Sequence, residues 1–134
     1  MNIASYADLI TAANAQAEPQ RLLFVFARAE LPDDATAPQK QRFEAGQGGT
    51  LAPVMCVDKL PAEQPHFDGL VGESKNTGLE WDIVFVTTMS GRAGIAPGSD
   101  EATQALKMMV ESVKQGAIGN FLALDRTGAA VSLN

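Results

Sequence analysis

The sequence predicts an α/β fold: a single domain, residues 1–134, with a mostly parallel mixed sheet of about five strands, helices on its faces and a C-terminal β-hairpin. Three observations lead to this class. The length of 134 residues suits one domain with its own hydrophobic core. Short apolar runs alternate with helical patterns along most of the chain, and the last two apolar runs are separated by a short turn containing glycine.

The first helix is predicted from Ser5 onward. Ser5 and Asp8 have the spacing of a capping box, in which each residue satisfies a backbone amide at the start of the helix. Apolar residues then recur at helical spacing at Tyr6, Leu9, Ile10 and Ala13. Pro19 ends this pattern. The run that follows, Arg21 to Arg28, is almost continuously apolar and is typical of a strand covered on both faces.

A long connection, residues 29–50, precedes the second strand. Thr36 and Gln39 predict the start of a short surface helix that ends at Gly46. The run Ala52 to Asp58 is then predicted as a strand, and Pro53 near its start indicates an edge position or a late start, because proline cannot donate a ladder hydrogen bond.

Two more helices alternate with the strongest strand. Phe67, Leu70 and Val71 mark a weak helix. Asp82 to Met89 is the strongest strand, and a long helix is expected after Ser99, which is predicted as its N-terminal cap, up to Gly116. The apolar stripe of this helix consists of Ala102, Leu106, Met109, Val110 and Val113, and Met108 beside it widens the apolar face. Residues 120–125 and 129–134 form the expected hairpin around Gly128.

Polar residues follow the predicted strands, and in a parallel sheet such residues gather at one edge. The sequence therefore predicts a ligand-binding edge for a small polar or anionic ligand. Its candidate residues are Arg28, Asp58, Lys59, Thr88, Ser90 and Arg92, together with Glu30 and the pair Asp33 and Asp34. The alternative is that these polar residues simply occupy exposed loops.

The segment TMSGRAGIAPGSDE, residues 88–101, contains three glycines but matches neither a phosphate-binding Walker loop nor a G-x-G-x-x-G fingerprint. In its second half, Ser99, Asp100 and Glu101 supply a helix start that already carries negative charge and would repel a phosphate. An anion is therefore expected only in the first half, Ser90 to Gly94, where Arg92 and several backbone amides are found.

Composition narrows the classes of partner. The net charge is −6 and the ten basic residues are scattered, so neither nucleic acid nor an anionic membrane is expected as a partner. The N-terminal stretch MNIASYADLI lacks the basic residues of a secretory signal, and the longest apolar run is too short to span a membrane. The single cysteine, Cys56, cannot form an internal disulfide, which indicates a cytoplasmic protein. Cys56 is predicted to lie on the same face of its strand as Val54 and to be buried.

No catalytic residue, metal ligand or cofactor is assigned. Glu63 and His66 have E-x-x-H spacing, but one copy interrupted by Pro65 does not make a di-iron site, and the chain has no other histidine. A catalytic triad would need His66 as its base, and no recognised nucleophile accompanies it.

Four stretches carry a resemblance that extends over the whole chain: RLLFVFARAELPDDAT, APVMCVDK, DIVFVTTMSGRAG and FLALDRTG. They resemble a family of small uncharacterised bacterial proteins that are sometimes labelled ribonucleotide reductase alpha subunits. Such reductases use a barrel of roughly 250 residues and several cysteines, whereas this chain is shorter and has Cys56 alone. The resemblance therefore implies at most an accessory role beside such an enzyme. The element order also resembles a thioredoxin-type arrangement, but without the C-x-x-C motif of dithiol chemistry.

Three hypotheses follow for function. The first is a non-enzymatic cytoplasmic protein that acts through protein–protein contacts and self-associates through the last helix or the terminal strand. The second is a binder of a small phosphate- or carboxylate-bearing ligand at the predicted edge. The third is an enzyme that uses Asp33, Asp34 or Asp58 as an acid or base.

Overall fold

The computed structural model describes residues 3–31, 34–44 and 50–132 and contains one four-stranded sheet. The strands are β1 (Gln20–Glu30), β2 (Thr50–Lys59), β3 (Ile83–Ser90) and β4 (Leu122–Leu124), in the spatial order β2-β1-β3-β4. Each neighbouring pair is antiparallel. The protein is thus an α/β domain, but the prediction of a mostly parallel sheet of about five strands is wrong.

The connections explain the antiparallel order. After β1, the chain carries helix α2 (Ala37–Glu44) beyond the end of the sheet and then turns back, so β2 runs against β1. Helix α3 (Phe67–Lys75) does lead from β2 to a strand of the same direction, β3. However, β1 lies between β2 and β3 and runs opposite to both. The alternation of helices and strands is real, and it does not fix which strands are neighbours.

The C-terminal segment differs from the expected full hairpin. β4 has three residues, and the described residues after the turn at Gly128, up to residue 132, form isolated bridges and no further strand: Leu124 bridges Ala130, and Ser5 bridges Ala129. The turn itself is as predicted around Gly128, whose φ of 86° is a left-handed conformation that favours glycine.

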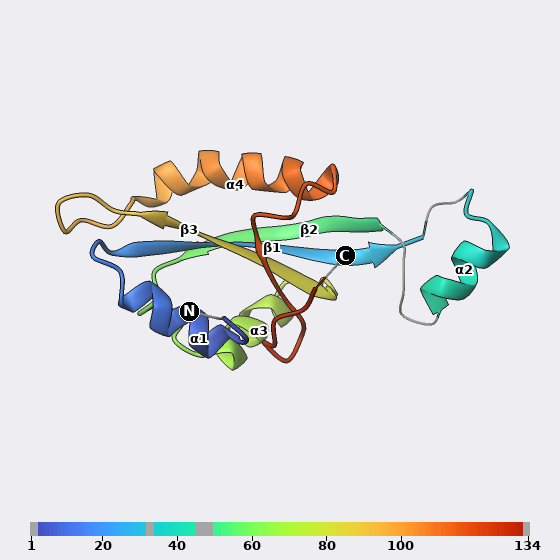
Figure 1. Cartoon of the computed structure of the whole chain (residues 1–134), viewed down its shortest axis with the longest axis horizontal. Coiled ribbons are helices and arrows are strands. Elements are labelled where there is room, and N and C mark those ends of the chain that lie inside the picture. Colours follow the sequence, from blue (N-terminus) through green and yellow to red (C-terminus); the bar gives the residue numbers. More distant parts are fainter. Residues whose placement is uncertain (1–2, 32–33, 45–49, 133–134) are drawn as a thin grey trace.

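Helices cover both faces of the sheet (Figure 1). Helix α4 (Ser99–Lys114) lies on one face, called here the α4 face, and α1 (Tyr6–Asn14) and α3 lie on the other, called the α1/α3 face. β1 is the inner strand of both cores: its even-numbered residues from Leu22 to Phe26 pack on the α1/α3 face, and its odd-numbered residues from Leu23 to Ala27 pack on the α4 face. This double cover explains the continuous apolar run that predicts a strand here.

Two predicted helix starts are confirmed and one is displaced. Ser5 Oγ accepts from the amide of Asp8, and Asp8 in turn accepts from the amide of Ala4. At the start of α2, Thr36 and Gln39 bond each other: the Gln39 amide donates to Thr36 Oγ1, and the Thr36 amide donates to Gln39 Oε1. Ser99, in contrast, is the first residue of α4 and not its cap, because Gly98 occupies the cap position and the Ser99 hydroxyl bonds to Asp58 instead.

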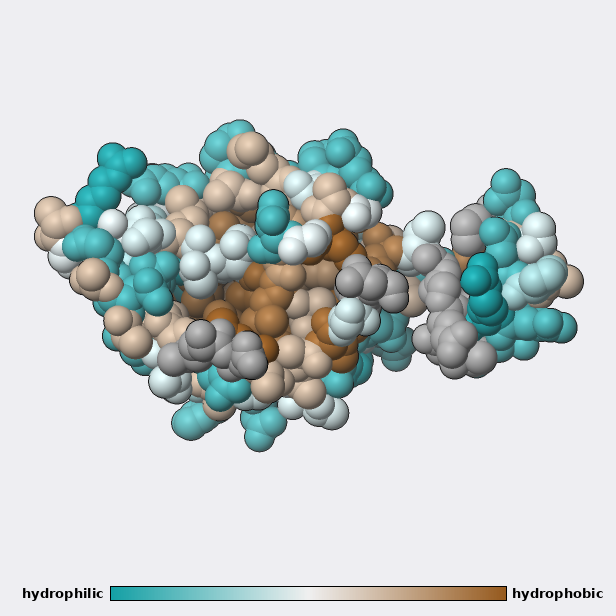
Figure 2. Space-filling model, in the orientation of Figure 1, coloured by the Kyte–Doolittle hydropathy of each residue, from teal (hydrophilic) through white to brown (hydrophobic). Residues whose placement is uncertain are grey.

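The region that bears α2 projects from one end of the molecule (Figure 1). In Figure 2 this projecting part is mostly hydrophilic, whereas apolar residues gather in the middle of the face that carries β3 and β4.

Candidate functional site

The structure divides the six predicted ligand-binding residues between the two ends of the sheet. Because β2 and β3 both run opposite to β1, their carboxyl ends do meet at one end, which brings Asp58, Lys59, Thr88 and Ser90 to the same end. Arg28 lies at the opposite end, where it pairs with Ala52 of β2 and its guanidinium binds the exposed carboxylate of Glu30 at 3.1 Å. The parallel sheet that would group Arg28 with the others does not exist.

Asp58 and Lys59 lie on opposite faces of β2, and each has a partner in the chain. On the α4 face, Asp58 Oδ2 accepts from Arg21 Nη1 at 2.6 Å and from the Ser99 hydroxyl at 3.0 Å. Arg21 Nε also donates to the carbonyl of Pro97 at 2.6 Å. These bonds attach the start of α4 to the sheet.

On the α1/α3 face, Lys59 Nζ binds the Glu73 carboxylate of α3 at 3.0 Å. Glu73 also accepts from the amide of Gln64, whose backbone carbonyl accepts from the Tyr6 hydroxyl at 2.6 Å. Burial, and secondarily the negative charge of Glu73, raises the pKa of Tyr6 to about 12. This network joins α1, β2 and α3, so Lys59 has a structural partner of its own.

Ser90 and Thr88 occupy the end of β3. Ser90 Oγ accepts from the Gln20 side chain at 2.9 Å, and Thr88 is exposed beside it. Both side chains belong to the α1/α3 face, because they pair with Gln20 and Leu22 of β1. Asp58, on the other face, is separated from them by the sheet.

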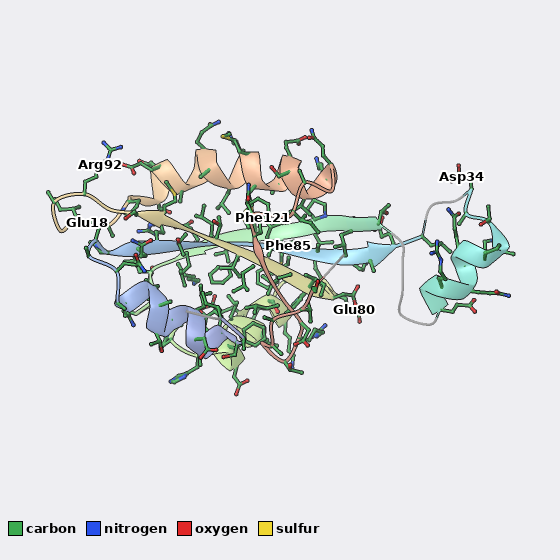
Figure 3. The ribbon with its side chains drawn as sticks, viewed as in Figure 1. Glu18, Asp34, Glu80, Phe85, Arg92 and Phe121 are labelled. Atoms are coloured by element: carbon green, nitrogen blue, oxygen red, sulfur yellow. The ribbon has the colours of Figure 1, made fainter. Side chains whose placement is uncertain are left out.

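The glycine-rich segment does bind an anionic group, but one that belongs to the chain itself. Arg92 and Ile95 exchange backbone hydrogen bonds of 2.9 Å, and Ala93 and Gly94 between them have φ of 52° and 78°, which makes a tight two-residue hairpin turn. The Gly94 amide donates to the Glu18 carboxylate at 3.0 Å. Figure 3 shows Arg92 and Glu18 at this end of the molecule, next to the loop.

The remaining chemical candidates are dispersed. Asp33 lies outside the described residues, Asp34 is exposed near the projecting helix α2, and His66 is exposed at the start of α3. Among the described residues, no three histidine, cysteine, aspartate or glutamate side chains cluster closely enough to hold a metal ion. In the same part of the chain, no helix is both long and apolar enough to cross a membrane.

Cys56 is exposed, so the prediction that it is buried is wrong. The sheet register is irregular where Val54 and Met55 of β2 both oppose Phe26, which is a β-bulge. The extra residue shifts the alternation of faces. Val54 packs on the α1/α3 face, whereas Cys56 is opposite Val25 on the α4 face, so the two do not share a face. Cys56 lies on the edge strand of the sheet, and its thiol is exposed.

The outer edge of β2, the side facing away from β1, is a long strand edge without a neighbouring strand in the described residues. Within the described residues, β2 pairs with β1 alone over its ten residues. The Ala27 carbonyl accepts from Asp82 and therefore points toward β3, and the Ala29 amide points to the same side. Because backbone groups alternate sides along a strand, odd-numbered residues of β1 bond β3 and even-numbered residues bond β2.

The orientation of the β2 backbone follows from this alternation. Residues of β2 that oppose odd-numbered β1 residues have their backbone groups facing outward, away from β1. These outward-facing residues are Leu51, Pro53, Cys56 and Asp58. The side chains from Leu51 to Met55, and that of Val57, are only partly buried. An edge of this length with apolar flanks can take up another strand.

Within the described residues, the protein's own chain closes the opposite edge of the sheet along Val84 to Val86 of β3, and the end of β3 from Thr87 to Ser90 lies beyond β4. β4 covers Val84 to Val86 of β3, and outside β4 the amide of Val131 donates to Ala123 at 2.9 Å. The N-terminal segment closes the layer further, since Ala130 donates to Ala4 at 2.8 Å. The terminal strand is one of the two predicted sites of self-association, and its outer side is already used.

The other predicted site is the widened apolar face of α4. Met109 is buried in the core as predicted, whereas Met108 is 66% exposed. Of its helical neighbours one turn away, Gln104 and Glu111 are exposed polar residues, and Ala105 and Ser112 are small and partly buried, so Met108 does not belong to a large apolar patch. The open edge of β2 is thus the larger candidate interaction surface.

Several of these features are not predicted by the sequence. Pro53 does indicate an edge strand, but the roles of Arg21, Glu18 and Glu73 depend on partners far away in the sequence.

Comparisons with protein families, curated proteins and solved structures found no match for this chain.

Proposed function

We propose that this protein is a protein-interaction module that self-associates by pairing the outer edge of β2 with the same edge of a second copy. The observation that carries the proposal is the ten-residue edge that, among the described residues, has β1 as its only strand partner. Main-chain hydrogen bonds supply affinity in such strand additions, and flanking side chains supply specificity. A two-fold axis lets one edge serve both copies.

The flanks of β2 suit a second copy better than a charged partner. From Leu51 to Val57, β2 carries no charged side chain, and its apolar residues are partly exposed on both faces. A second β2 brings the same apolar residues to the opposite side of the interface. The exposed and unbridged thiol of Cys56 suits a reducing compartment such as the cytoplasm.

The test is the oligomeric state of the purified protein, measured by sedimentation or by light scattering with size-exclusion chromatography over a range of concentrations. A dimer is expected for the wild type. Cys56→Lys places a charge in the middle of the open edge, without removing a core contact, and should weaken association at least tenfold. A wild-type chain that stays monomeric at high concentration would contradict the proposal.

A matched control lies on β3. Thr88 is exposed on a strand of the same sheet and, because it pairs with Leu22, its backbone groups face away from β1. Thr88→Lys therefore makes the same chemical change at the other side of the sheet and should leave the dimer intact. If Thr88→Lys dissociates the dimer and Cys56→Lys does not, the interface lies at β3 instead.

Salt provides a second measurement. Each chain carries a net charge of −6, so two copies repel one another at low ionic strength. If apolar contacts and main-chain hydrogen bonds hold the dimer, added salt should tighten it by screening this repulsion. An interface built on ion pairs would weaken instead.

The small-ligand hypothesis and the accessory role implied by the sequence resemblance also remain proposals. A ligand that uses Arg92 would be detected as a loss of thermal stabilisation in Arg92→Ala. An accessory role would use the same edge of β2 for another chain, and the wild-type protein would then be monomeric alone.

A further inference from the structure

We infer that the two β2 strands pair in one particular register, with the two-fold axis between Val54 and Met55. In this register Pro53 of one copy lies opposite Cys56 of the other, and Leu51 lies opposite Asp58. The inference rests on the proposed self-association and specifies which residues meet.

The positions at which the β2 backbone groups face outward favour this register. The outward-facing residues of β2 are Leu51, Pro53, Cys56 and Asp58, as derived above from the pairing with β1. Because of the bulge, the two inner members, Pro53 and Cys56, are three residues apart and not two. An antiparallel copy meets this pattern in phase only when each outward-facing residue opposes another outward-facing residue along the whole strand.

The axis between Val54 and Met55 satisfies that condition over all ten residues of β2. The bulges of the two copies then lie opposite each other. Every outward-facing residue of one copy also lies opposite an outward-facing residue of the other. All four outward side chains belong to the α4 face, so both copies keep their α4 helices on the same side of the continuous sheet.

Other registers match only part of the strand. If Cys56 lay opposite Cys56, then Asp58 would oppose Val54 in the bulge, and the outward groups would fall out of phase after one pair. If Cys56 lay opposite Asp58, only these two residues would pair in phase, and the apolar half of β2 from Leu51 to Val54 would extend past its partner.

Proline and charge are also accommodated in the inferred register. Pro53 has no amide to donate, but its carbonyl can accept from the amide of the second copy's Cys56. Asp58 and Lys59 are placed at the two far ends of the interface, opposite Leu51 and Thr50 of the other copy. No like charges oppose one another across the strands, whereas directly opposed like charges are destabilising.

Site-directed crosslinking tests the register. In the inferred pairing, Thr50 of one copy and Lys59 of the other form a non-hydrogen-bonded pair, with Cα atoms about 4.5 Å apart, which a disulfide can bridge. Thr50→Cys and Lys59→Cys are prepared separately in a Cys56→Ser background, mixed, and oxidised with copper phenanthroline. A mixed disulfide dimer is expected as the main product, identified by mass spectrometry.

The matched control is each single-cysteine variant alone. Two copies of Thr50 lie at opposite ends of the paired strands, roughly 30 Å apart, so Thr50→Cys alone should not crosslink. The circular dichroism spectrum of each variant is compared with the wild type, because Lys59→Cys also removes the ion pair with Glu73.

Two outcomes distinguish a wrong register from a wrong function. A wild-type dimer in which Cys56 crosslinks rapidly with Cys56, while the mixed variants do not crosslink, overturns the register but leaves self-association standing. A monomeric wild type overturns both.

Discussion

The two edge strands of the sheet, β4 and β2, differ in length and in whether the chain bonds to their outer sides. At β4 the edge strand has three residues, the C-terminal segment bonds to its outer side through Val131, and the N-terminal segment bonds to that C-terminal segment. At β2 the edge strand has ten residues, and in the described part of the chain nothing pairs with its outer side. The chain thus covers the middle of β3 and leaves all ten residues of β2 open, so β2 offers the longer edge for strand addition.

The closed edge depends on Gly128, and breaking it should give the largest effect. Gly128 has a φ of 86°, and a Cβ atom there would lie 3.0 Å from the Phe67 ring. Its carbonyl accepts from the Tyr6 amide at 2.9 Å, which joins the turn to α1. Gly128→Ala combines backbone strain with overpacking and should cost about 2–4 kcal/mol of unfolding free energy, measured by denaturant titration.

Gly119→Ala is the matched control for this change. A Cβ atom added at Gly119 would meet no atom within 4 Å, and the φ of this residue is not in the left-handed region. Its replacement should change the unfolding free energy by less than about 0.5 kcal/mol. If Gly128→Ala is equally mild, the turn does not need a left-handed residue and the closed edge is more tolerant than the geometry indicates.

The open edge is held in place by the ion pair at its end, and Asp58→Ala should give the next effect. The side chains of Arg21 and Asp58 are 13% and 17% exposed, so removing the carboxylate leaves a mostly buried guanidinium without its partner. The Ser99 hydroxyl loses its acceptor as well. A loss of about 1–3 kcal/mol is expected in the same denaturant titration, reduced from the fully buried case by solvent screening.

A comparison with Glu30→Ala sharpens this result. Glu30 also accepts from an arginine, Arg28, but both side chains are close to half exposed. Exposed ion pairs contribute little, so Glu30→Ala should be nearly neutral. Equal losses from the two variants would mean that burial of the Arg21 pair does not determine its contribution.

Local signals in the sequence predict the elements but not their arrangement. The caps at Ser5 and Thr36, the strand around Phe24 and the stop at Gly116, which has a φ of 75°, each depend on neighbours within a few residues. Strand direction is non-local: the same alternation of helices and strands fits a parallel sheet, and it fits the observed order in which β1 separates β2 from β3.

The candidate site shows the same division. Pro53 is a local sign of an edge strand, and β2 is one. The exposure of Cys56 depends on a bulge that shifts the register between β1 and β2, and a two-residue spacing cannot reveal such a shift. The partner of the Gly94 amide, Glu18, is separated from it by 76 positions, and only the folded chain brings the two together.

At neutral pH, Tyr6→Phe is expected to have a smaller effect than Gly128→Ala or Asp58→Ala, and its effect depends on pH. Tyr6 connects the two edges: its amide bonds to Gly128 at the closed edge, and its hydroxyl bonds to Gln64, which contacts the Glu73 partner of Lys59. Removing the hydroxyl should cost about 1 kcal/mol at pH 7, which is typical for one hydrogen bond.

The alkaline range distinguishes this bond from simple packing. The folded pKa of Tyr6, about 12, lies above the ordinary tyrosine value of 10.0, so the folded state holds the proton more tightly than the unfolded chain. The contribution of the hydroxyl is therefore complete below pH 10 and decreases as the pH rises toward 12. The difference in melting temperature between wild type and Tyr6→Phe should shrink over this interval. Only the wild type carries the phenol, whose pKa falls when the chain unfolds, so alkaline pH favours unfolding of the wild type alone. A constant difference from pH 8 to about 12 would show that Tyr6 ionises as freely in the folded protein as in the unfolded chain, and that the network beneath β2 does not shield it.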